Sequence, residues 1–366
     1  MIKKKVAALP LRCPSCGSFM VHKVKTHSLI CINCKSTKAI ETSTYTKNKK
    51  PLFSLDKTTI NPIQKEVDCP SCGADIEFNL FQISKNCPYC KTPLVTKTFN
   101  KIDIDAIIPF FIDTNEAKNI FKEWIGSLWF APNALSDLKN FEHNFKALYL
   151  PYFSFDAKTQ SFYEGERGDA YYVRVPRRVI INGREEIVEQ LERRIRWHRV
   201  SGVVARDFAD ILVNSYKDLP PIAKRMINYD LNRLVTFNPS FLSSYESFEY
   251  NQEPREAYYE AKEYMKDIIY NDVLWDIGGD EQRVYSINTT YANEGVELFA
   301  LPIWMSSFKY KNKEYPILIN GLNGDIIGER PYSYVKIFFL GLFIFLIVSL
   351  LFFLENKYHF VEQLSY

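Results

Sequence analysis

Eight cysteines carry the most specific chemistry in this chain of 366 residues, and all of them lie between positions 13 and 90. They form four Cys-x-x-Cys pairs, and fourteen residues separate the first pair from the second and the third from the fourth. The unit C-x2-C-x14-C-x2-C therefore occurs twice, displaced by 56 residues, which identifies a tandem repeat. The first cysteine unit contains Cys13, Cys16, Cys31 and Cys34, and the second cysteine unit contains Cys69, Cys72, Cys87 and Cys90.

Each unit supplies four thiolates, which is the complete tetrahedral shell of a structural zinc site. The spacing predicts two structural Zn²⁺ ions per chain and no catalytic zinc, because no ligand position is left for water. The sequence C-P-S-C-G at 13–17 recurs at 69–73, and it is typical of a tight metal-binding turn. Two alternatives stay open: a rubredoxin-like iron site, or disulfides, which need an oxidising compartment although no signal peptide precedes the units. We expect His22 and His27 to be ordinary surface residues.

Basic side chains are concentrated at the N-terminal end. Residues 1–50 contain eleven Lys or Arg and one acid, residues 51–100 are neutral, and residues 101–366 have a net charge of −7. A basic segment attracts the phosphate of nucleic acid or of anionic lipid, unless its charges are merely solvated. Only two aromatic residues lie in this segment, so we expect weak nucleic-acid binding without sequence preference. The residues assigned to it are Lys3, Lys4, Lys5, Lys23 and Lys25.

A long apolar segment lies near the C-terminal end. In the eighteen residues from Ile337 to Leu354, only Gly341 and Ser349 are not strongly apolar. As a helix this segment measures about 27 Å, close to the roughly 30 Å of a bilayer hydrocarbon core. We predict a transmembrane helix at 336–354. Because eight reduced thiolates belong in a reducing compartment, we expect a single-pass cell-membrane protein with most of the chain in the cytoplasm.

Composition divides the chain into segments of different character. We predict an α+β fold class with largely antiparallel pairing in the body. The phrase Leu150-Pro151-Tyr152-Phe153 resembles Leu301-Pro302-Ile303-Trp304, and Gly-Glu-Arg occurs twice, which is compatible with two related sheet modules in the body. The segments are a first zinc ribbon at 10–36, a linker at 37–65, a second zinc ribbon at 66–95, the body at 101–334, the transmembrane helix at 336–354 and a short external tail at 355–366.

Hydrophobic periodicity predicts two helices in the body, over 115–129, with Thr114 as N-cap, and over 255–275. Asn182-Gly183 predicts the turn of a hairpin over 171–203. Eight arginines and four glutamates alternate with apolar residues there, which favours cross-strand ion pairs on a solvated face over a nucleic-acid surface. Further strands are expected at 148–155, 284–291, 298–310, 314–319 and 325–328.

Motifs for catalysis are missing from the sequence: it has no P-loop, no H-E-x-x-H and no G-x-S-x-G. The phrase Gly278-Gly279-Asp280-Glu281-Gln282 nearly spells the GGDEF signature of diguanylate cyclases, but Gln282 replaces the aromatic residue. A turn after the second predicted helix explains the glycines equally well, and the role of this phrase is left open. We expect no enzyme activity, no catalytic residues and no small-molecule substrate.

Several phrases together resemble one bacterial family. They are W-F-A-P-N at 129–133, L-P-Y at 150–152, G-E-R-G-D at 165–169, G-G-D-E-Q-R at 278–283, N-G-L-N-G at 320–324 and G-E-R-P-Y-S at 328–333. The chain resembles membrane-anchored proteins with tandem TFIIB-type zinc ribbons, often described as primosomal-protein-N′-like, replication-factor-Y-like or YdjG-like. The resemblance implies a membrane-associated adaptor in envelope-stress assembly, with a phage-shock-type protein partner, and the missing catalytic motifs make the expected adaptor non-enzymatic. The alternative is a membrane-tethered, replication-associated accessory protein that binds nucleic acid through its basic first ribbon.

Overall fold

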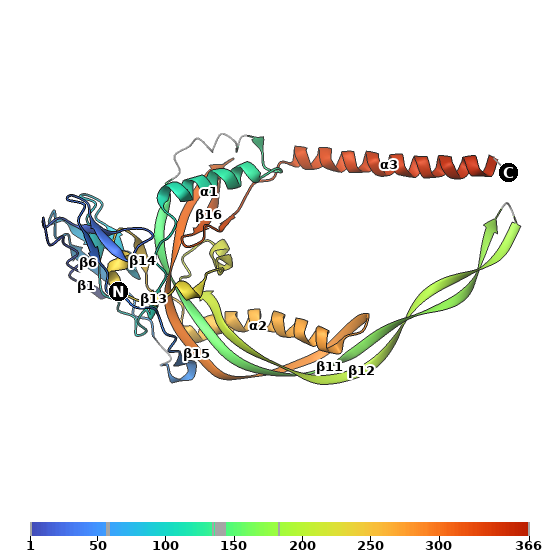
Figure 1. Ribbon diagram of the computed structural model, residues 1–366, viewed down its shortest axis with the longest axis horizontal. Coiled ribbons are helices and arrows are strands. Elements are labelled where there is room, and N and C mark those ends of the chain that lie inside the picture. The colour runs from blue at the N-terminus through green and yellow to red at the C-terminus, as the bar shows by residue number, and fades with distance from the viewer. Residues whose placement is uncertain (1, 56–58, 134, 136–143, 182–183, 365–366) are drawn as a thin grey trace.

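The computed structural model describes residues 2–55, 59–133, 135, 144–181 and 184–364 (Figure 1). Within these ranges the protein is a mixed α+β fold in which strands dominate and most strand pairs are antiparallel. The described α-helices are α1 (Thr114–Ser127), α2 (Pro254–Ile277) and α3 (Tyr334–Leu364). The predicted α+β class is confirmed at this level, and the apolar helix α3 projects away from the body (Figure 1).

A central sheet of eleven strands forms the core of the body. Its longest strands are β11 (Lys146–Ile181), β12 (Arg184–Asn214) and β15 (Glu281–Tyr310), and β11 lies between the other two in antiparallel pairing. The shorter strands are β5 (Lys50–Pro51), β8 (Gln82–Asn86), β9 (Pro93–Val95), β10 (Ala106–Ile107), β13 (Val235–Thr236), β14 (Glu246–Phe248), β16 (Lys313–Asn320) and β17 (Ile326–Gly328). The strands expected at 284–291 and 298–310 are one continuous strand, β15.

Two small sheets lie at the N-terminal end of the chain, with strand orders β2-β3-β4 and β1-β6-β7. Their strands are β1 (Ile2–Lys5), β2 (Met20–His22), β3 (Ser28–Cys31), β4 (Thr37–Ala39), β6 (Ile63–Asp68) and β7 (Asp75–Glu77). Short 3₁₀ turns are η1 (Leu52–Ser54), η3 (Pro221–Arg225), η4 (Leu231–Arg233) and η5 (Pro239–Leu242). The predicted linker at 37–65 contacts the body, since β5 pairs with β15 and Thr44 forms a bridge with Val235.

The predicted hairpin is the outer part of the β11–β12 pair. This pairing runs continuously outward to Ile181 opposite Arg184, which confirms the hairpin, while Asn182 and Gly183 lie outside the described residues. Ion pairs join the two strands diagonally rather than directly: Arg174 to Glu189 at 3.4 Å, and Arg178 to Glu185 at 4.0 Å. The side chains of both pairs are largely exposed, so they stabilise the hairpin only slightly.

The phrase at 278–282 forms the turn between α2 and β15. Gly278 and Gly279 have φ angles of +63° and +77°, a conformation that favours glycine. A Cβ atom added to Gly279 would lie 2.9 Å from the carbonyl oxygen of Gly168, so a side chain has no room there. The backbone N–H of Asp280 donates to that same carbonyl at 2.8 Å. These contacts give the phrase a structural role, because they end α2 and start β15 on the edge of β11.

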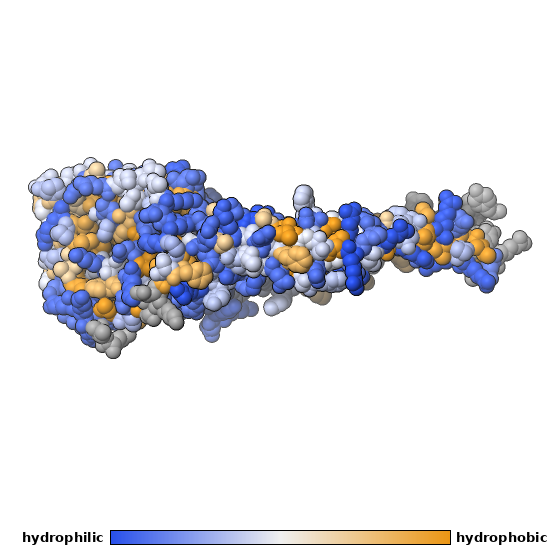
Figure 2. Space-filling model, turned by 90° about the horizontal axis from the view of Figure 1, so that it is seen from below, coloured by the Kyte–Doolittle hydropathy of each residue, from blue (hydrophilic) through white to orange (hydrophobic). Residues whose placement is uncertain are grey.

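Beyond Gly168, no third strand pairs with the hairpin among the residues that the structure describes. β15 begins opposite Gly168, and α2, which packs along β11 and β12, ends nearby. Residues 169–181 and 184–196 therefore continue outward as a two-stranded ribbon, which we call the arm (Figure 1). Seen from below, this projecting part of the molecule shows hydrophobic and hydrophilic side chains intermixed (Figure 2).

The two Leu-Pro phrases meet in the middle of the central sheet. Leu150 of β11 pairs directly with Leu301 of β15, so an approximate two-fold axis passes between the two strands. Before its phrase, each long strand pairs in parallel with a short strand, β14 on β11 and β10 on β15. From the third residue of its phrase onward, each pairs with an antiparallel strand, β12 on β11 and β16 on β15. Pro151 and Pro302 lie where each long strand changes its partner.

Two β-α-β-β units follow from this arrangement: β10-α1-β11-β12 and β14-α2-β15-β16. The first strand of each unit pairs with the long strand of the other unit, so both units belong to one sheet. Both helices have an acidic residue at the N-cap position, but only the side chain of Asp113 caps its helix, since the Glu253 carboxylate accepts from the N–H of Thr59 instead. The predicted N-cap Thr114 is wrong by one residue, because Asp113 forms a capping box with Glu116, three positions on.

Candidate metal centres

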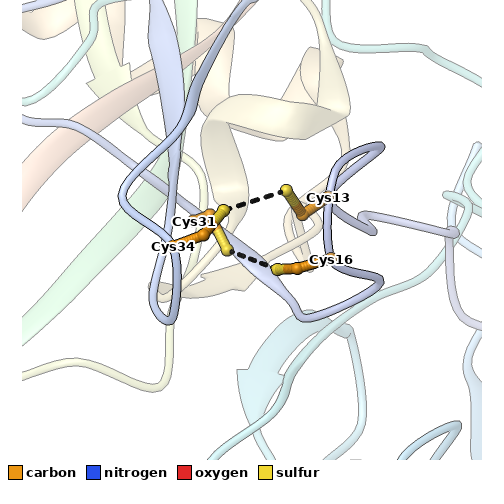
Figure 3. A group of neighbouring side chains, drawn as sticks. All are labelled: Cys13, Cys16, Cys31 and Cys34. Carbon is orange, nitrogen blue, oxygen red and sulfur yellow. Dashed lines mark hydrogen bonds between the residues drawn. The ribbon is translucent and has the colours of Figure 1, made fainter.

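The four sulfur atoms of the first cysteine unit converge on one point (Figure 3). They all lie within 4.8 Å of one another, with Cys13 to Cys34 at 3.6 Å and Cys16 to Cys31 at 3.5 Å. A tetrahedral site with metal–sulfur bonds of about 2.3 Å has sulfur–sulfur edges of about 3.8 Å. A disulfide needs about 2.05 Å. These free cysteines therefore fit the ligand shell of a four-coordinate metal ion.

The second cysteine unit repeats this geometry. Its sulfur atoms also lie within 4.8 Å of one another, with Cys69 to Cys90 at 3.5 Å and Cys72 to Cys87 at 3.8 Å. In both units the first cysteine of each pair is buried and the second is exposed. The structure therefore brings together all eight predicted ligands as two separate clusters, each of which can hold a metal ion near the surface.

Four similar turns position the sulfur atoms. In each turn the N–H of the first cysteine donates to the carbonyl five residues later, at 2.7 to 2.8 Å. The residue after the second cysteine has a positive φ in every turn: Gly17 at +71°, Lys35 at +61°, Gly73 at +72° and Lys91 at +61°. A Cβ atom added to Gly17 or Gly73 would meet nothing within 4 Å, so the left-handed backbone, rather than crowding, favours glycine there.

Hydroxyl groups beside the sulfur atoms were not predicted from the sequence. Oγ of Ser36 lies 3.0 Å from Sγ of Cys13 and 3.1 Å from Sγ of Cys34, and Oγ1 of Thr92 lies 3.1 Å from Sγ of Cys90. Hydrogen bonding with Ser36 lowers the pKa of Cys13 to about 6, and Thr92 does the same for Cys90. This favours the thiolate, the form that binds metal, at Cys13 and Cys90, whereas the neighbouring cysteines and burial raise the pKa of Cys16 to about 11 and that of Cys72 to about 12. The recurrence of Cys-Lys-Ser/Thr at 34–36 and 90–92 is the signal that could have revealed these groups.

Three of the five lysines predicted to bind nucleic acid form ion pairs within the protein. Lys3 on β1 lies 3.2 Å from Glu66 and 3.3 Å from Glu77, and the Lys5 ammonium is 2.8 Å from Asp68. Lys25, in the β2–β3 turn, pairs at 2.5 Å with Glu116 of α1, far along the chain. The two remaining lysines have no acid at such a distance among the described residues: the Lys4 ammonium lies 4.9 Å from the Phe99 ring, and Lys23 is exposed.

Lysines of the predicted linker also contact acids of the body. Lys50 pairs with Asp105 at 2.8 Å, Lys49 contacts Asp210 at 3.1 Å, and Lys47 pairs with the same Asp210 carboxylate. Burial alone would raise the pKa of Asp210, but the two lysines outweigh burial and hold this pKa below its usual range. Much of the N-terminal positive charge is therefore matched inside the fold.

His22 is buried, so its predicted place on the surface is wrong, whereas His27 is exposed as expected. The His22 ring lies between two hydrogen-bond partners, the hydroxyl of Tyr245 at 3.1 Å and the carbonyl of Thr26 at 2.8 Å. Burial lowers its pKa to about 4. The residue joins the first cysteine unit to the body rather than ligating metal, which the count of four cysteines already indicated.

The second cysteine unit is joined to the central sheet through the backbone. β8 and β9, which flank Cys87 and Cys90, are strands of that sheet, and β8 pairs with β14. Beside them, Lys65 and Glu249 form a buried ion pair of 3.4 Å, with exposed fractions of 1% and 3%. Burial lowers the pKa of Lys65 and raises that of Glu249, while each partner opposes the shift of the other. The Lys65 ammonium also donates to the carbonyl of Gln82, at the start of β8.

Helix α3 is the described helix that is long and apolar enough to cross a membrane, over Tyr334–Glu355. None of its apolar stretch is buried against the body. Its first turn is held by the loop after α1: the N–H of Ser333 donates to the Phe130 carbonyl at 2.7 Å, and Lys336 donates to the Ala131 carbonyl at 2.8 Å. The predicted apolar helix is thus confirmed as a candidate span with a fixed starting point.

Comparison with known proteins yields no relative: no family model, no curated protein and no solved structure matches this chain. The family resemblance stays a prediction.

Proposed function

We propose that this protein is a non-enzymatic adaptor, anchored in the cell membrane by α3, that holds one structural Zn²⁺ ion in each cysteine unit and faces the cytoplasm. The observation that carries the proposal is the occurrence of two complete four-thiolate clusters and one unburied apolar helix in the same chain. Four thiolates leave no position for a reacting water, so the metal stabilises the fold. Reduced cysteines suit a cytoplasmic location.

The arm is the part of the adaptor that we assign to a protein partner. Ile187 and Leu191, in the two-stranded arm, have exposed fractions of 70% and 63%. A two-stranded ribbon is only marginally stable alone, and exposed apolar side chains on it favour binding to another protein. The family resemblance would make this partner a phage-shock-type protein.

The ion pairs of the basic N-terminal segment favour the adaptor over the nucleic-acid alternative. Lys3, Lys5 and Lys25 have carboxylate partners within 3.3 Å, which a phosphate would have to displace. Nucleic-acid binding by this segment would then be confined to low salt.

Three measurements test the adaptor. Elemental analysis of the purified chain should give two zinc ions, and iron or fewer than two ions would contradict the metal assignment. Truncation after Val335 should release the protein from high-salt-washed membranes, and a pelleting truncation would contradict anchoring by α3. A cysteine in an added C-terminal tag should react with an impermeant reagent applied to intact cells, whereas protection would reverse the orientation.

The arm is tested by photocrosslinking in cells. A photoreactive residue at Leu191 should give one discrete crosslinked protein, whereas the same residue at Tyr259, exposed on α2, should not. Equal crosslinking at both positions would contradict a partner site on the arm.

A further inference from the structure

A pocket of about 570 Å³ lies at the root of α3, between α1, β16, β17 and the segment that leads into α3. Trp124 and Leu128 of α1 form one wall, and Tyr315 of β16 forms another. Arg330 and Tyr332, in the segment before α3, complete it. From this pocket we infer a binding site for the phosphate of an anionic phospholipid headgroup. The inference rests on the proposed anchoring by α3.

Charge in the pocket suits a phosphate. Its lining contains three cations, Arg225, Lys313 and Arg330, and a single acid, Glu329. Glu329 contacts Lys313 at 3.8 Å, so it neutralises one of the three cations. Among the residues that the structure describes, neither Arg225 nor Arg330 forms an ion pair with a carboxylate. A guanidinium group can donate two parallel hydrogen bonds to a phosphate, which makes arginine the preferred residue for this recognition.

The arrangement around Arg330 leaves its charge available. Its Nε lies 3.5 Å from the Tyr332 hydroxyl, the outer limit of a hydrogen bond, and its guanidinium carbon lies 5.2 Å from the centre of the Tyr332 ring. Arg225, at the end of η3, is exposed. Two guanidinium groups from distant parts of the chain therefore line one pocket, and neither has an anionic partner among the described residues.

The position of the pocket relative to α3 indicates that the phosphate belongs to a lipid. The apolar stretch of α3 begins at Tyr334, four residues after Arg330, a separation of at most about 14 Å along the chain. Headgroups occupy roughly 5–7 Å on each side of the hydrocarbon core. The pocket therefore lies close to headgroup depth when α3 crosses the membrane.

Exposed aromatic residues lie close to the pocket and to the start of α3, at the same expected depth in the membrane interface. Trp129 and Tyr334 have exposed fractions of 80% and 84%, and Tyr332 is also exposed. Trp and Tyr prefer the membrane–water interface, because each ring is apolar and carries one polar group. The hydrogen bonds from Ser333 and Lys336 to the loop after α1 keep Trp129 beside the start of the helix. A soluble phosphate ester would gain nothing from these rings, so the arrangement favours a lipid.

Native mass spectrometry of the full-length protein tests this site. The protein in neutral detergent micelles is offered phosphatidylglycerol and phosphatidylcholine in equal amounts. We expect it to retain the anionic lipid with a preference of at least about tenfold, or 1.4 kcal/mol. The triple variant R225Q/K313Q/R330Q should lose this preference. The matched control K158Q/K217Q/K266Q removes three exposed lysines outside the pocket and should keep it.

The inference is contradicted by the following results. Wild-type protein without a preference, or a preference that survives the triple variant, rules out the pocket as a headgroup site. Complete displacement of the lipid by millimolar glycerol phosphate would assign the pocket to soluble phosphate esters instead. If the triple variant is unfolded by circular dichroism, the single variant R225Q, at an exposed position, should still lower the preference. Failure of anchoring is distinguishable, since the protein would then leave the membrane fraction without detergent.

Discussion

The two cysteine units are chemically alike but are held differently. Both have the same spacing, two sulfur–sulfur contacts of 3.5 to 3.8 Å and a hydroxyl group two residues after the last cysteine. The first unit has a small sheet of its own, β2-β3-β4, and meets the body through side chains such as His22 and through isolated backbone hydrogen bonds, from Lys25 to Phe110 and from His22 to Ser243. The second shares β8 and β9 with the central sheet. The spacing of the cysteines therefore determines each metal site, whereas long-range strand pairing determines which part of the body depends on that site for its stability.

We expect the two units to differ most in how far the loss of one metal ligand lowers the thermal stability of the body. Cys16 and Cys72 occupy equivalent, exposed positions in the two units. We expect Cys72→Ser to lower the main thermal transition by about 10 °C or more, because β8 and β14 lose their support, and Cys16→Ser to lower it by about 3 °C or less. Calorimetry and hydrogen exchange in β14 measure this, and equal effects would show that both units are coupled to the body alike.

Removing the buried cation beside the second unit is the next largest change. We expect Lys65→Met to cost about 3–5 kcal/mol, since it leaves the Glu249 carboxylate buried without its partner. Lys3→Met is the control, because the Lys3 pairs are more exposed and we expect a much smaller loss of unfolding free energy. Guanidinium unfolding in detergent gives both values, and similar values would contradict a special role for the buried pair.

Acid should weaken the first unit's contact with the body through His22. Its pKa is about 4 in the folded protein and about 6.5 when unfolded, so the unfolded state binds the proton more readily. The stabilisation by neutral His22 is complete above pH 6.5 and is lost as the pH falls from 6.5 to 4, a total of about 3 kcal/mol.

Unfolding free energies between pH 7 and pH 4 measure this loss. The variant His22→Asn should flatten the dependence, whereas His27→Asn, at an exposed position, removes only a minor contribution to the lowered pKa of His22 and should change the dependence much less. A dependence that persists in His22→Asn would assign the acid sensitivity to other groups.

The smallest predicted effect should be the same in both units. Gly17→Ala and Gly73→Ala each force a side chain into left-handed backbone of φ near +70°, at about 1 kcal/mol. Neither added methyl group meets a neighbour within 4 Å, so the effect is local. Competition with a chelator should show zinc affinity reduced about fivefold in each case. Clearly unequal reductions would mean that the two turns are not equivalent.

Features with a local cause could be predicted from the sequence. Ligand spacing brought the eight cysteines into two clusters, an unbroken apolar stretch formed α3, and the Asn182-Gly183 signal matches the register of the β11–β12 hairpin. The start of α1 was missed by one residue, because Asp113 and Thr114 are both good caps and only the position of Glu116 distinguishes them.

What the sequence by itself determined is the chemistry of the metal clusters, the candidate membrane helix and the existence of the main helices and hairpin, since each depends on residues near one another in the chain. The tertiary structure alone decided that β1 joins the sheet of the second cysteine unit, that β8 pairs with β14, that the basic lysines meet distant acids, and that His22 and Lys65 are buried. Strand partners and buried contacts depend on the summed packing of segments far apart in the chain, 184 residues in the pair Lys65–Glu249. No local pattern of apolar and charged residues specifies such pairings.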